Sequence, residues 1–475
     1  MSQPLPKVVV IGGGIAGLAA APYLSGAAGG PARAAVTLLE AGDRFGGKLL
    51  TGEVGGVQVD LGAESMLARR PEAVELAREV GLADVLEPPG TAKAAVWTRD
   101  ALRPLPAGQL MGVPGDLAAL AASTVLTDQG LRRARAERPQ PAVDQDVAIG
   151  AFVAARLGRE VVDRLVEPLL GGVYAGRADE ISLRAAVPQL LPIAQRGGPL
   201  VAGVHELLDR PQAAGPVFQG LRGGIGTLPV AVAAACRRAG AELRTDTPVR
   251  ELLRTPAGWR VVTAERLIEA DAVVLAVPAP VAAALLAPHA PGAAAELAGV
   301  EYAGMALVTM AFRRADLPLT PPGSGFLVPP VDGRSIKAAT FSSQKWDWLG
   351  RAAPDTFLLR TSLGRHREEA ALDLDDGELV ARSLADLRAA VGLAALPYAS
   401  AVTRWRAGLP QYPVGHQARV DRIRAAVAGL GGLALAGAAY DGVGIPACVA
   451  GARRAVAEVL TPLPGAGPTE GTMGA

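Results

Sequence analysis

The stretch that decides the fold is an apolar run that leads into a glycine-rich turn, Lys7-Val8-Val9-Val10-Ile11-Gly12-Gly13-Gly14-Ile15-Ala16-Gly17. Residues 7–11 are typical of a buried parallel strand, and residues 15–25 predict a helix of small side chains. The turn fits G-x-G-x-x-G: Gly12 permits a tight bend, Gly14 lets a phosphate approach the backbone and Gly17 packs the helix on the strand. N–H groups at the start of that helix attract phosphate. The stretch therefore predicts a dinucleotide site.

A second short apolar strand is expected over residues 36–39, and it ends at Glu40. Strand, helix and strand together form one βαβ unit with a crossover helix. A carboxylate at this position accepts hydrogen bonds from a ribose hydroxyl of a bound dinucleotide.

The next segment distinguishes between dinucleotides, and it reads Glu40-Ala41-Gly42-Asp43-Arg44-Phe45-Gly46-Gly47-Lys48. It resembles the second phosphate-contacting motif of the flavin amine oxidase superfamily, E-x-x-x-R-x-G-G-R. Lys48 stands where that motif has arginine, so it supplies charge without a bidentate fork. The resemblance favours FAD over NAD.

Three later segments fit the same interpretation. A glycine turn, Gly62-Ala63-Glu64-Ser65, follows the alternating strand expected over residues 57–61, and by the resemblance it passes close to the flavin ring. Val249 lies where such flavoproteins bring a strand against the adenine. Near the carboxyl terminus, a buried strand, a glycine loop and a helix follow one another over residues 433–460. That helix start can stabilise negative charge on a reduced flavin.

The whole pattern resembles the porphyrinogen oxidases, from about residue 7 to residue 460. The motifs that carry the resemblance occur in the expected order: Asp60–Ser65, Val166-Glu167-Pro168-Leu169-Leu170, Gly171-Gly172-Val173-Tyr174-Ala175-Gly176, Thr403-Arg404-Trp405, and Gly442-Val443-Gly444-Ile445-Pro446 with Cys448.

The resemblance implies an FAD-dependent oxidase that removes six electrons from a porphyrinogen in three steps, with O₂ as acceptor and H₂O₂ as product. It favours coproporphyrinogen III in haem biosynthesis and leaves protoporphyrinogen IX as the alternative. The residues that it places against FAD are Gly12, Gly13, Gly14, Ile15, Ala16, Gly17, Glu40, Ala41, Lys48, Gly62, Ala63, Glu64, Ser65, Val249, Trp405, Val443, Gly444 and Ile445.

No side chain is assigned a catalytic role, because the flavin carries the chemistry and the protein holds the macrocycle against it. The four histidines have no metal-ligand spacing, so no metal is expected. The propionates of a porphyrinogen need cationic partners, and Arg69, Arg70 and Arg177 are the candidates.

Two other activities on the same scaffold are considered. An amine oxidase often places a lysine near the flavin, for which Lys337 and Lys345 are candidates, but aromatic residues make up only 4% of the chain. A carotenoid-type desaturase needs a membrane-docking surface. A non-enzymatic binding protein on this fold is disfavoured by the intact glycine motifs.

The expected fold class is α/β plus α+β, with a discontinuous Rossmann-like FAD-binding domain, a sheet-containing substrate domain and a helical domain. Helical patterns over residues 116–126, 129–138, 149–157 and 160–170 define the last of these. The predicted limits are 1–95, 221–290 and 405–464 for the FAD-binding domain, 96–220 for the helical domain, 291–404 for the substrate-binding domain and 465–475 for a disordered tail.

The 475 residues are too many for one core, and a net charge of +1 gives no reason to expect nucleic acid. Cys236 and Cys448 have no redox spacing. We expect no signal peptide and no transmembrane helix, so a cytoplasmic location is predicted, with peripheral membrane contact and the oligomeric state left open.

Overall fold

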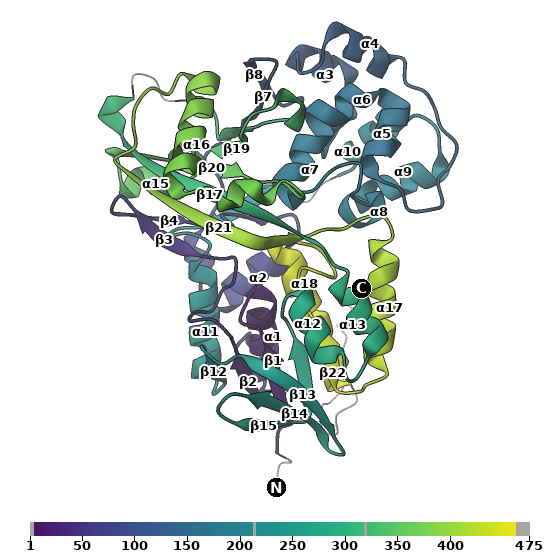
Figure 1. Ribbon diagram of the computed structural model, residues 1–475, viewed down its shortest axis with the longest axis vertical. Coiled ribbons are helices and arrows are strands. Elements are labelled where there is room, and N and C mark those ends of the chain that lie inside the picture. The colour runs from purple at the N-terminus through teal and green to yellow at the C-terminus, as the bar shows by residue number, and fades with distance from the viewer. Residues whose placement is uncertain (1–3, 212–214, 318–320, 462–475) are drawn as a thin grey trace.

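The computed structural model describes residues 4–211, 215–317 and 321–461. The predicted tail at 465–475 lies outside these residues. In Figure 1 a lower part built on a parallel sheet carries two upper parts, one with a long, mostly antiparallel sheet and one made of helices. The predicted α/β and α+β fold class is confirmed.

A parallel five-stranded sheet forms the core of the lower part, in the order β12-β2-β1-β16-β22. The chain moves outward from β1 through β2 to β12, then continues on the other side of β1 with β16 and β22. This is the order of doubly wound dinucleotide-binding sheets, in which ligands bind beyond the carboxyl ends of the strands. The strands are β1 (Lys7–Ile11), β2 (Ala35–Leu39), β12 (Glu242–Arg244), β16 (Ala272–Leu275) and β22 (Leu433–Leu435).

Both faces of this sheet are buried, which explains its continuous apolar strands. Val8 and Val10 pack under α1 (Ile15–Ser25), α11 (Thr227–Arg238) and α18 (Ile445–Leu460). Val9 and Ile11 face the opposite layer. That layer contains α12 (Ala279–Leu286), α13 (Pro291–Ala298), α17 (His416–Ala428) and the small sheet β13 (Val249–Thr255), β14 (Gly258–Thr263) and β15 (Leu267–Ala270).

A seven-stranded sheet forms the upper part on the left of Figure 1, in the order β21-β17-β20-β19-β18-β7-β8. Its outer face packs against α16 (Asp376–Val391), where Ala306 and Val308 meet Leu379 and Leu387. The strands are β7 (Ala94–Thr98), β8 (Ala101–Pro104), β17 (Tyr302–Arg313), β18 (Gly325–Leu327), β19 (Ile336–Thr340), β20 (Thr356–Leu363) and β21 (Ala399–Pro410).

The helical part packs around its own apolar core, on the right of Figure 1. The predicted helix at 149–157 is found with the same limits. Its helices are α3 (Leu117–Ser123), α4 (Asp128–Arg135), α5 (Ile149–Leu157), α6 (Arg159–Val161), α7 (Glu167–Tyr174), α8 (Leu183–Ala186), α9 (Leu191–Arg196) and α10 (Leu200–Leu208).

The single helix expected over 160–170 is instead three consecutive pieces. A π-helical turn, Val162–Val166, joins α6 to α7. Pro168 has no backbone N–H to donate to the carbonyl of Arg164, and the helical turn before it widens.

Three details depart from the predicted domain limits. The limit at 95/96 falls inside β7 and the limit at 404/405 falls inside β21. Helix α13, placed in the substrate-binding domain by the sequence, packs with α12 and α17 beside the parallel sheet. An apolar pattern shows that a helix or strand is buried on one side, but it does not show which partner covers that side.

Candidate functional site

The glycine turn after β1 lies at the carboxyl edge of the parallel sheet, at the point where the strand order reverses. Gly12 has a φ of +104°, and a Cβ there would stand 2.4 Å from the carbonyl oxygen of Ala276. A Cβ on Gly17 would stand 1.9 Å from the carbonyl oxygen of Gly12. At Gly14, by contrast, an added Cβ would meet no described atom within 4 Å. The turn thus packs tightly against neighbouring protein atoms at residues 12 and 17, whereas residue 14 faces space in which a ligand can lie.

The second motif folds back onto this turn. The amide of Gly46 donates to the carbonyl of Gly13 over 2.8 Å. The Glu40 carboxylate accepts from the amides of Gly13, at 2.6 Å, and Gly42, at 2.7 Å. An ionised carboxylate has about four acceptor positions, so Glu40 retains capacity for a ribose hydroxyl. Ala41 is exposed beside it.

The segment before β13 also reaches this edge. The amide of Thr247 donates to the carbonyl of Glu40, and the amide of Asp246 donates to the carbonyl of Gly42, both over 2.8 Å. Val249 begins β13 two residues later, half-buried against the lower core. The backbone thus carries Val249 toward the end of the site marked by Glu40.

The carboxyl-terminal loop supplies a second helix start at the same edge. Gly444 precedes α18 in an extended conformation and has no side chain to accept from the first N–H groups of the helix, while Ile445 begins the helix and is buried. Val443 is partly buried against the helical core. Burial lowers the pKa of Lys48, and the side chain of Cys448, in the first turn of α18, opposes this effect. Lys48 therefore lies close to this helix start.

The glycine turn at residues 62–65 meets Lys48 and Trp405. A Cβ on Gly62 would stand 2.1 Å from the carbonyl oxygen of Lys48 and 3.2 Å from the Trp405 ring. The indole Nε1 of Trp405 donates to the carbonyl of Leu61 over 3.1 Å. The amide of Ala63 donates to the carbonyl of Lys48 over 3.1 Å. Ser65, two residues later, is half-buried.

Glu64 points into a buried charge cluster. Lys345 Nζ contacts one carboxylate oxygen, and Arg360 Nη2 lies 3.1 Å from the other. Arg360 Nη1 also donates to the carbonyl of Gly62 over 2.7 Å. Burial alone would raise the pKa of Glu64, but the two cations outweigh it and the pKa is lowered. The ionised Glu64 holds the turn against the upper sheet.

Asp60, two residues before the same turn, links it to the segment at residues 225–226. Its carboxylate accepts from the amides of Ile225, at 2.9 Å, and Gly226, at 3.2 Å. Burial raises its pKa to about 7, against the opposing effects of those two amides and of Arg360.

This raised pKa predicts a pH dependence of stability. Between the ordinary value of 3.8 and about 7, folded Asp60 binds a proton that the unfolded chain does not, so stability falls as pH rises through that window. The fall amounts to at most about 4 kcal/mol. Urea unfolding at pH 5 and pH 7.5 should show it in the wild type, and Asp60→Asn should lack that part of the slope. An equal slope in both proteins would contradict the assignment.

The inner face of the seven-stranded sheet covers the site. Met305 pairs with Trp405 and Thr309 pairs with Arg360, so these side chains share the face opposite α16. Lys337 sits at a register shift of β19 between Ile336 and Ala338, and its Nζ lies 3.9 Å from the sulfur of Met305. Burial, with the charge of Arg365 added, lowers the pKa of Lys337 to about 7.

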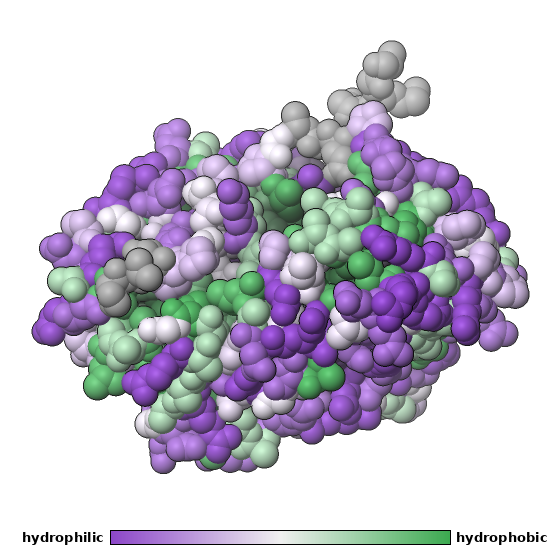
Figure 2. Space-filling model, turned by 90° about the horizontal axis from the view of Figure 1, so that it is seen from above, coloured by the Kyte–Doolittle hydropathy of each residue, from purple (hydrophilic) through white to green (hydrophobic). Residues whose placement is uncertain are grey.

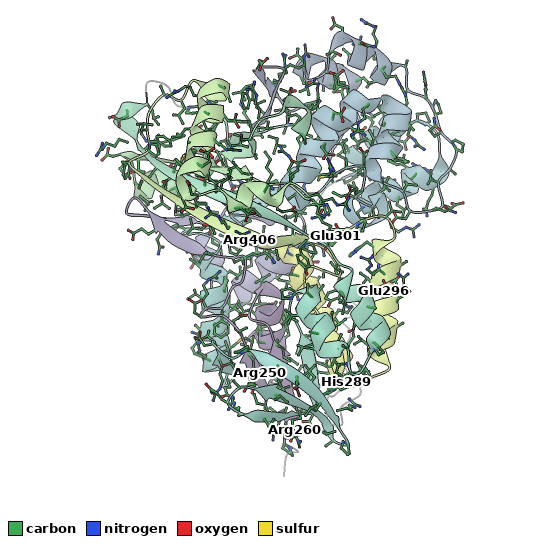
Figure 3. All side chains as sticks on the ribbon, viewed as in Figure 1. Arg250, Arg260, His289, Glu296, Glu301 and Arg406 are labelled. Atoms are coloured by element: carbon green, nitrogen blue, oxygen red, sulfur yellow. The ribbon has the colours of Figure 1, made fainter. Side chains whose placement is uncertain are left out.

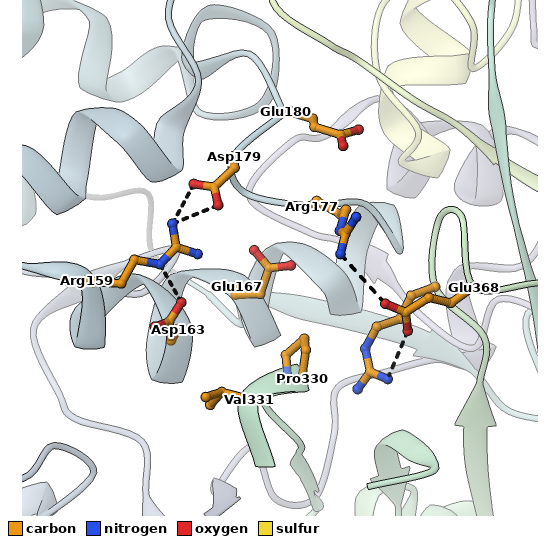
Figure 4. Close-up of a pocket in the computed structure, with 10 residues that line it drawn as sticks. Arg159, Asp163, Glu167, Arg177, Asp179, Glu180, Pro330, Val331 and Glu368 are labelled. Carbon is orange, nitrogen blue, oxygen red and sulfur yellow. Dashed lines mark hydrogen bonds and ion pairs between the residues drawn. The ribbon is translucent and has the colours of Figure 1, made fainter. Parts of the chain in front are cut away.

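The three arginines predicted to bind substrate do not converge. Arg69 lines a hollow of about 500 Å³ beside Arg78 and Pro71. Arg70 pairs with Glu72 over 2.8 Å and is exposed. Arg177 lines a different hollow, of about 380 Å³ (Figure 4). From above, Figure 2 shows hydrophobic residues in recesses between hydrophilic ones on the face formed by the two upper parts.

Sequence reasoning missed Arg360, which holds Glu64 and the carbonyl of Gly62. It singled out Lys337 and Lys345 for an amine-oxidase role, whereas Lys345 holds Glu64. Within the described residues, no group of three or more His, Cys, Asp or Glu side chains is placed to hold a metal ion.

Comparison with known proteins agrees with this geometry. The family of flavin containing amine oxidoreductases matches residues 15–460. The chain belongs to this family. A member of the flavin-containing amine oxidoreductases is an oxidoreductase, and membership of this family makes its cofactor FAD. The open space at Gly14, the spare acceptor positions of Glu40 and the uncapped start of α18 all fit this flavin dinucleotide.

Similar members of the flavin-containing amine oxidoreductases cover almost the whole chain. The chain is 38% identical to a coproporphyrinogen III oxidase of Mycobacterium tuberculosis H37Rv, over 96% of this chain and 97% of the relative. A coproporphyrinogen III oxidase of Bacillus subtilis is 32% identical, with 97% and 99% covered. A crystal structure from Exiguobacterium sp. 255-15, provisionally named a protoporphyrinogen oxidase, has a TM-score of 0.84 at 34% identity, with 97% and 99% covered.

Among the described residues, no helix combines the length and the apolar character that crossing a membrane requires.

Proposed function

We propose that the chain is an FAD-dependent oxidase that converts coproporphyrinogen III to coproporphyrin III in haem biosynthesis, with O₂ as acceptor and H₂O₂ as product. The observation that carries the proposal is the similarity to the two coproporphyrinogen III oxidases over nearly the full length of each chain. The porphyrinogen oxidase motifs at 171–176 and 442–446 lie in α7 with the residues just after it, and at the start of α18. We propose a cytoplasmic location as well.

When bound, FAD supplies the hydride acceptor, and O₂ takes the electrons from it. The residues of the chain have binding and orienting roles. Residues 12–17 and 40–48 would hold the phosphates and ribose. The start of α18 would stabilise negative charge on the flavin edge through its free N–H groups. Glu64, fixed by Lys345 and Arg360, would keep the 62–65 turn in place beneath the porphyrinogen.

The overall reaction sets a countable ratio. A porphyrinogen loses six electrons and six protons, and each O₂ takes up two of each, so one porphyrin is formed for three H₂O₂. Purified protein should be yellow, should form porphyrin fluorescence from coproporphyrinogen III in air and should release about three peroxides per porphyrin. Catalase added to a parallel reaction should remove the peroxide signal and leave porphyrin formation unchanged.

The second candidate substrate is protoporphyrinogen IX, favoured by the name of the similar Exiguobacterium structure. Both substrates should be assayed side by side after subtraction of the rate without protein. Faster turnover of protoporphyrinogen IX would replace the proposed substrate. A yellow protein inactive on both would exclude the porphyrinogen oxidase function and favour an amine oxidase or desaturase activity.

A further inference from the structure

A charged hollow adjoins the carboxyl-terminal end of α7. It has a volume of about 380 Å³ and lies between α7, the turn at Pro330–Val331 and the loop at residues 364–368 (Figure 4). The amide of His366 donates to the carbonyl of Ala175 over 2.8 Å, which fastens the loop to the end of α7. The porphyrinogen oxidase motif at 171–176 thus ends beside this hollow.

Most acids in the hollow already have close partners. Asp163 and Asp179 bind Arg159 at 2.6 Å and 2.7 Å, as the dashed lines in Figure 4 show. Glu167 accepts from the amide of Ala178 over 2.7 Å, and burial raises its pKa. Glu180 pairs with an arginine outside the hollow at 3.0 Å. Among the acids that line the hollow, Glu368 is therefore the one with only distant partners.

Glu368 is shared by two arginines at long distances. Arg177 Nη2 lies 3.9 Å from one of its oxygens, and Arg365 Nη1 lies 4.0 Å from the other. Neither distance is that of a hydrogen bond. The Arg177 and Glu368 side chains are each 49% exposed, whereas Arg365 is 14% exposed and donates to the carbonyl of Val328 over 3.3 Å. The half-exposed Glu368 carboxylate thus forms only long ion pairs with the two guanidinium groups.

A third basic side chain, Lys337, lies near enough to Arg365 for the two charges to affect each other. Lys337 is 7% exposed. In the part of the chain that the structure describes, no carboxylate lies within 4.0 Å of its Nζ. A buried charge without a counter-ion is costly, so the pKa of Lys337 falls to about 7, and an arriving anion favours its protonated form. Lys337 contacts Met305, which pairs with Trp405, so the cationic group extends from the hollow to the inner face of the sheet.

We propose that Arg365 and Arg177 bind a carboxylate of the substrate in this hollow, and that Glu368 is the chain's own carboxylate with which it competes. The inference rests on the proposed function, because a porphyrinogen carries propionates around its rim. A guanidinium pairs with a carboxylate through two parallel N–H groups, which the long contacts to Glu368 leave available. Coproporphyrinogen III has four propionates and protoporphyrinogen IX has two, so either substrate supplies the carboxylate that such a site binds.

Arg365→Gln tests the proposal, and Arg367→Gln is its matched control. Arg367 lies in the same loop but points to Glu180 and to Glu301, which Figure 3 places where the upper and lower parts meet. Arg365→Gln should raise KM for coproporphyrinogen III about tenfold, with a smaller change in kcat and an unchanged flavin spectrum. Arg177→Gln should act in the same direction. Arg367→Gln should stay within about twofold of the wild type.

Two further variants separate binding from folding. Arg365→Lys retains the charge and should recover part of the lost affinity, which a merely structural role does not predict. Glu368→Gln removes the competing carboxylate and should lower KM about threefold. An unchanged KM in Arg365→Gln, or equal effects of Arg365→Gln and Arg367→Gln, would overturn the proposal.

Failure of the proposed function is recognised separately, because wild-type protein would then oxidise neither porphyrinogen. In that case the carboxylate site is tested by direct binding of coproporphyrin III, measured through the quenching of its fluorescence. Wild-type binding that weakens about tenfold in Arg365→Gln and not in Arg367→Gln would support the carboxylate site. Absence of wild-type binding, or equal binding in all three proteins, would overturn it.

Discussion

Replacing Gly14 with valine is expected to give a folded protein without flavin. A Cβ at Gly14 meets no described atom within 4 Å, and the backbone there has a φ of −68°, which valine adopts readily. The new side chain would instead occupy the space that the dinucleotide phosphates need. We expect FAD affinity to fall by at least about 100-fold, roughly 3 kcal/mol. The measurement is the flavin absorbance per protein after gel filtration, with circular dichroism to check folding.

Gly30→Val is the matched control for this variant. An added Cβ there also meets nothing within 4 Å, but Gly30 lies in the loop after α1, away from the glycine turn. It should retain its yellow colour. Gly17→Ala supplies the opposite case, because its Cβ would stand 1.9 Å from the carbonyl of Gly12 and should destabilise the protein itself. Full flavin content in Gly14→Val would show that the phosphates bind elsewhere.

Replacing Glu64 with glutamine is expected to destabilise the folded protein by about 3 kcal/mol. The variant preserves shape but leaves Lys345 and Arg360, whose side chains are only 19% and 14% exposed, without their counter-charge. The lowered pKa of Glu64 gives the sign of the pH effect: the stabilisation is present above the ordinary carboxyl range and is lost as pH falls through the lowered pKa. Urea unfolding at several FAD concentrations, extrapolated to zero FAD, measures the loss, so that a change in flavin affinity does not enter.

Glu378→Gln is the control, since its pair with Arg382 lies on the exposed side of α16 at 2.8 Å. Such a helical surface pair contributes about 0.5 kcal/mol or less. Equal losses in the two variants would mean that the Glu64 cluster adds nothing beyond a surface ion pair.

The phosphate-binding end of the site follows from local sequence. A buried strand, a glycine turn and a helix of small residues were predicted at 7–25, and the structure has β1 and α1 at those positions. The carboxyl ends of parallel strands share one edge, so the turns after β1, β2 and β22 had to lie together once the sheet was parallel. Contact of each predicted residue with FAD remains a prediction.

The substrate side could not be predicted in the same way. Glu64 forms ion pairs with Lys345 and Arg360, which lie far from it in the sequence. Neither cation belongs to a motif that predicts contact with Glu64. Arg365 and Lys337 come together because β19 shifts register and the chain turns after β20, features that side-chain periodicity does not encode. The choice of Arg177 rested on its position after the 171–176 motif. Arg365, among many arginines, had no such signal.

The parallel sheet joins β1 to β22, which lie far apart in the sequence, and this has a consequence for how the protein is made. β1 leaves the ribosome long before β22 and α18, which complete its sheet and cover its apolar face. Until residue 460 has been synthesised, Val8, Val10 and Leu18 lack part of their final cover. A nascent chain must therefore keep these surfaces from associating between the synthesis of β1 and that of α18, and in this interval chaperones and proteases can bind them.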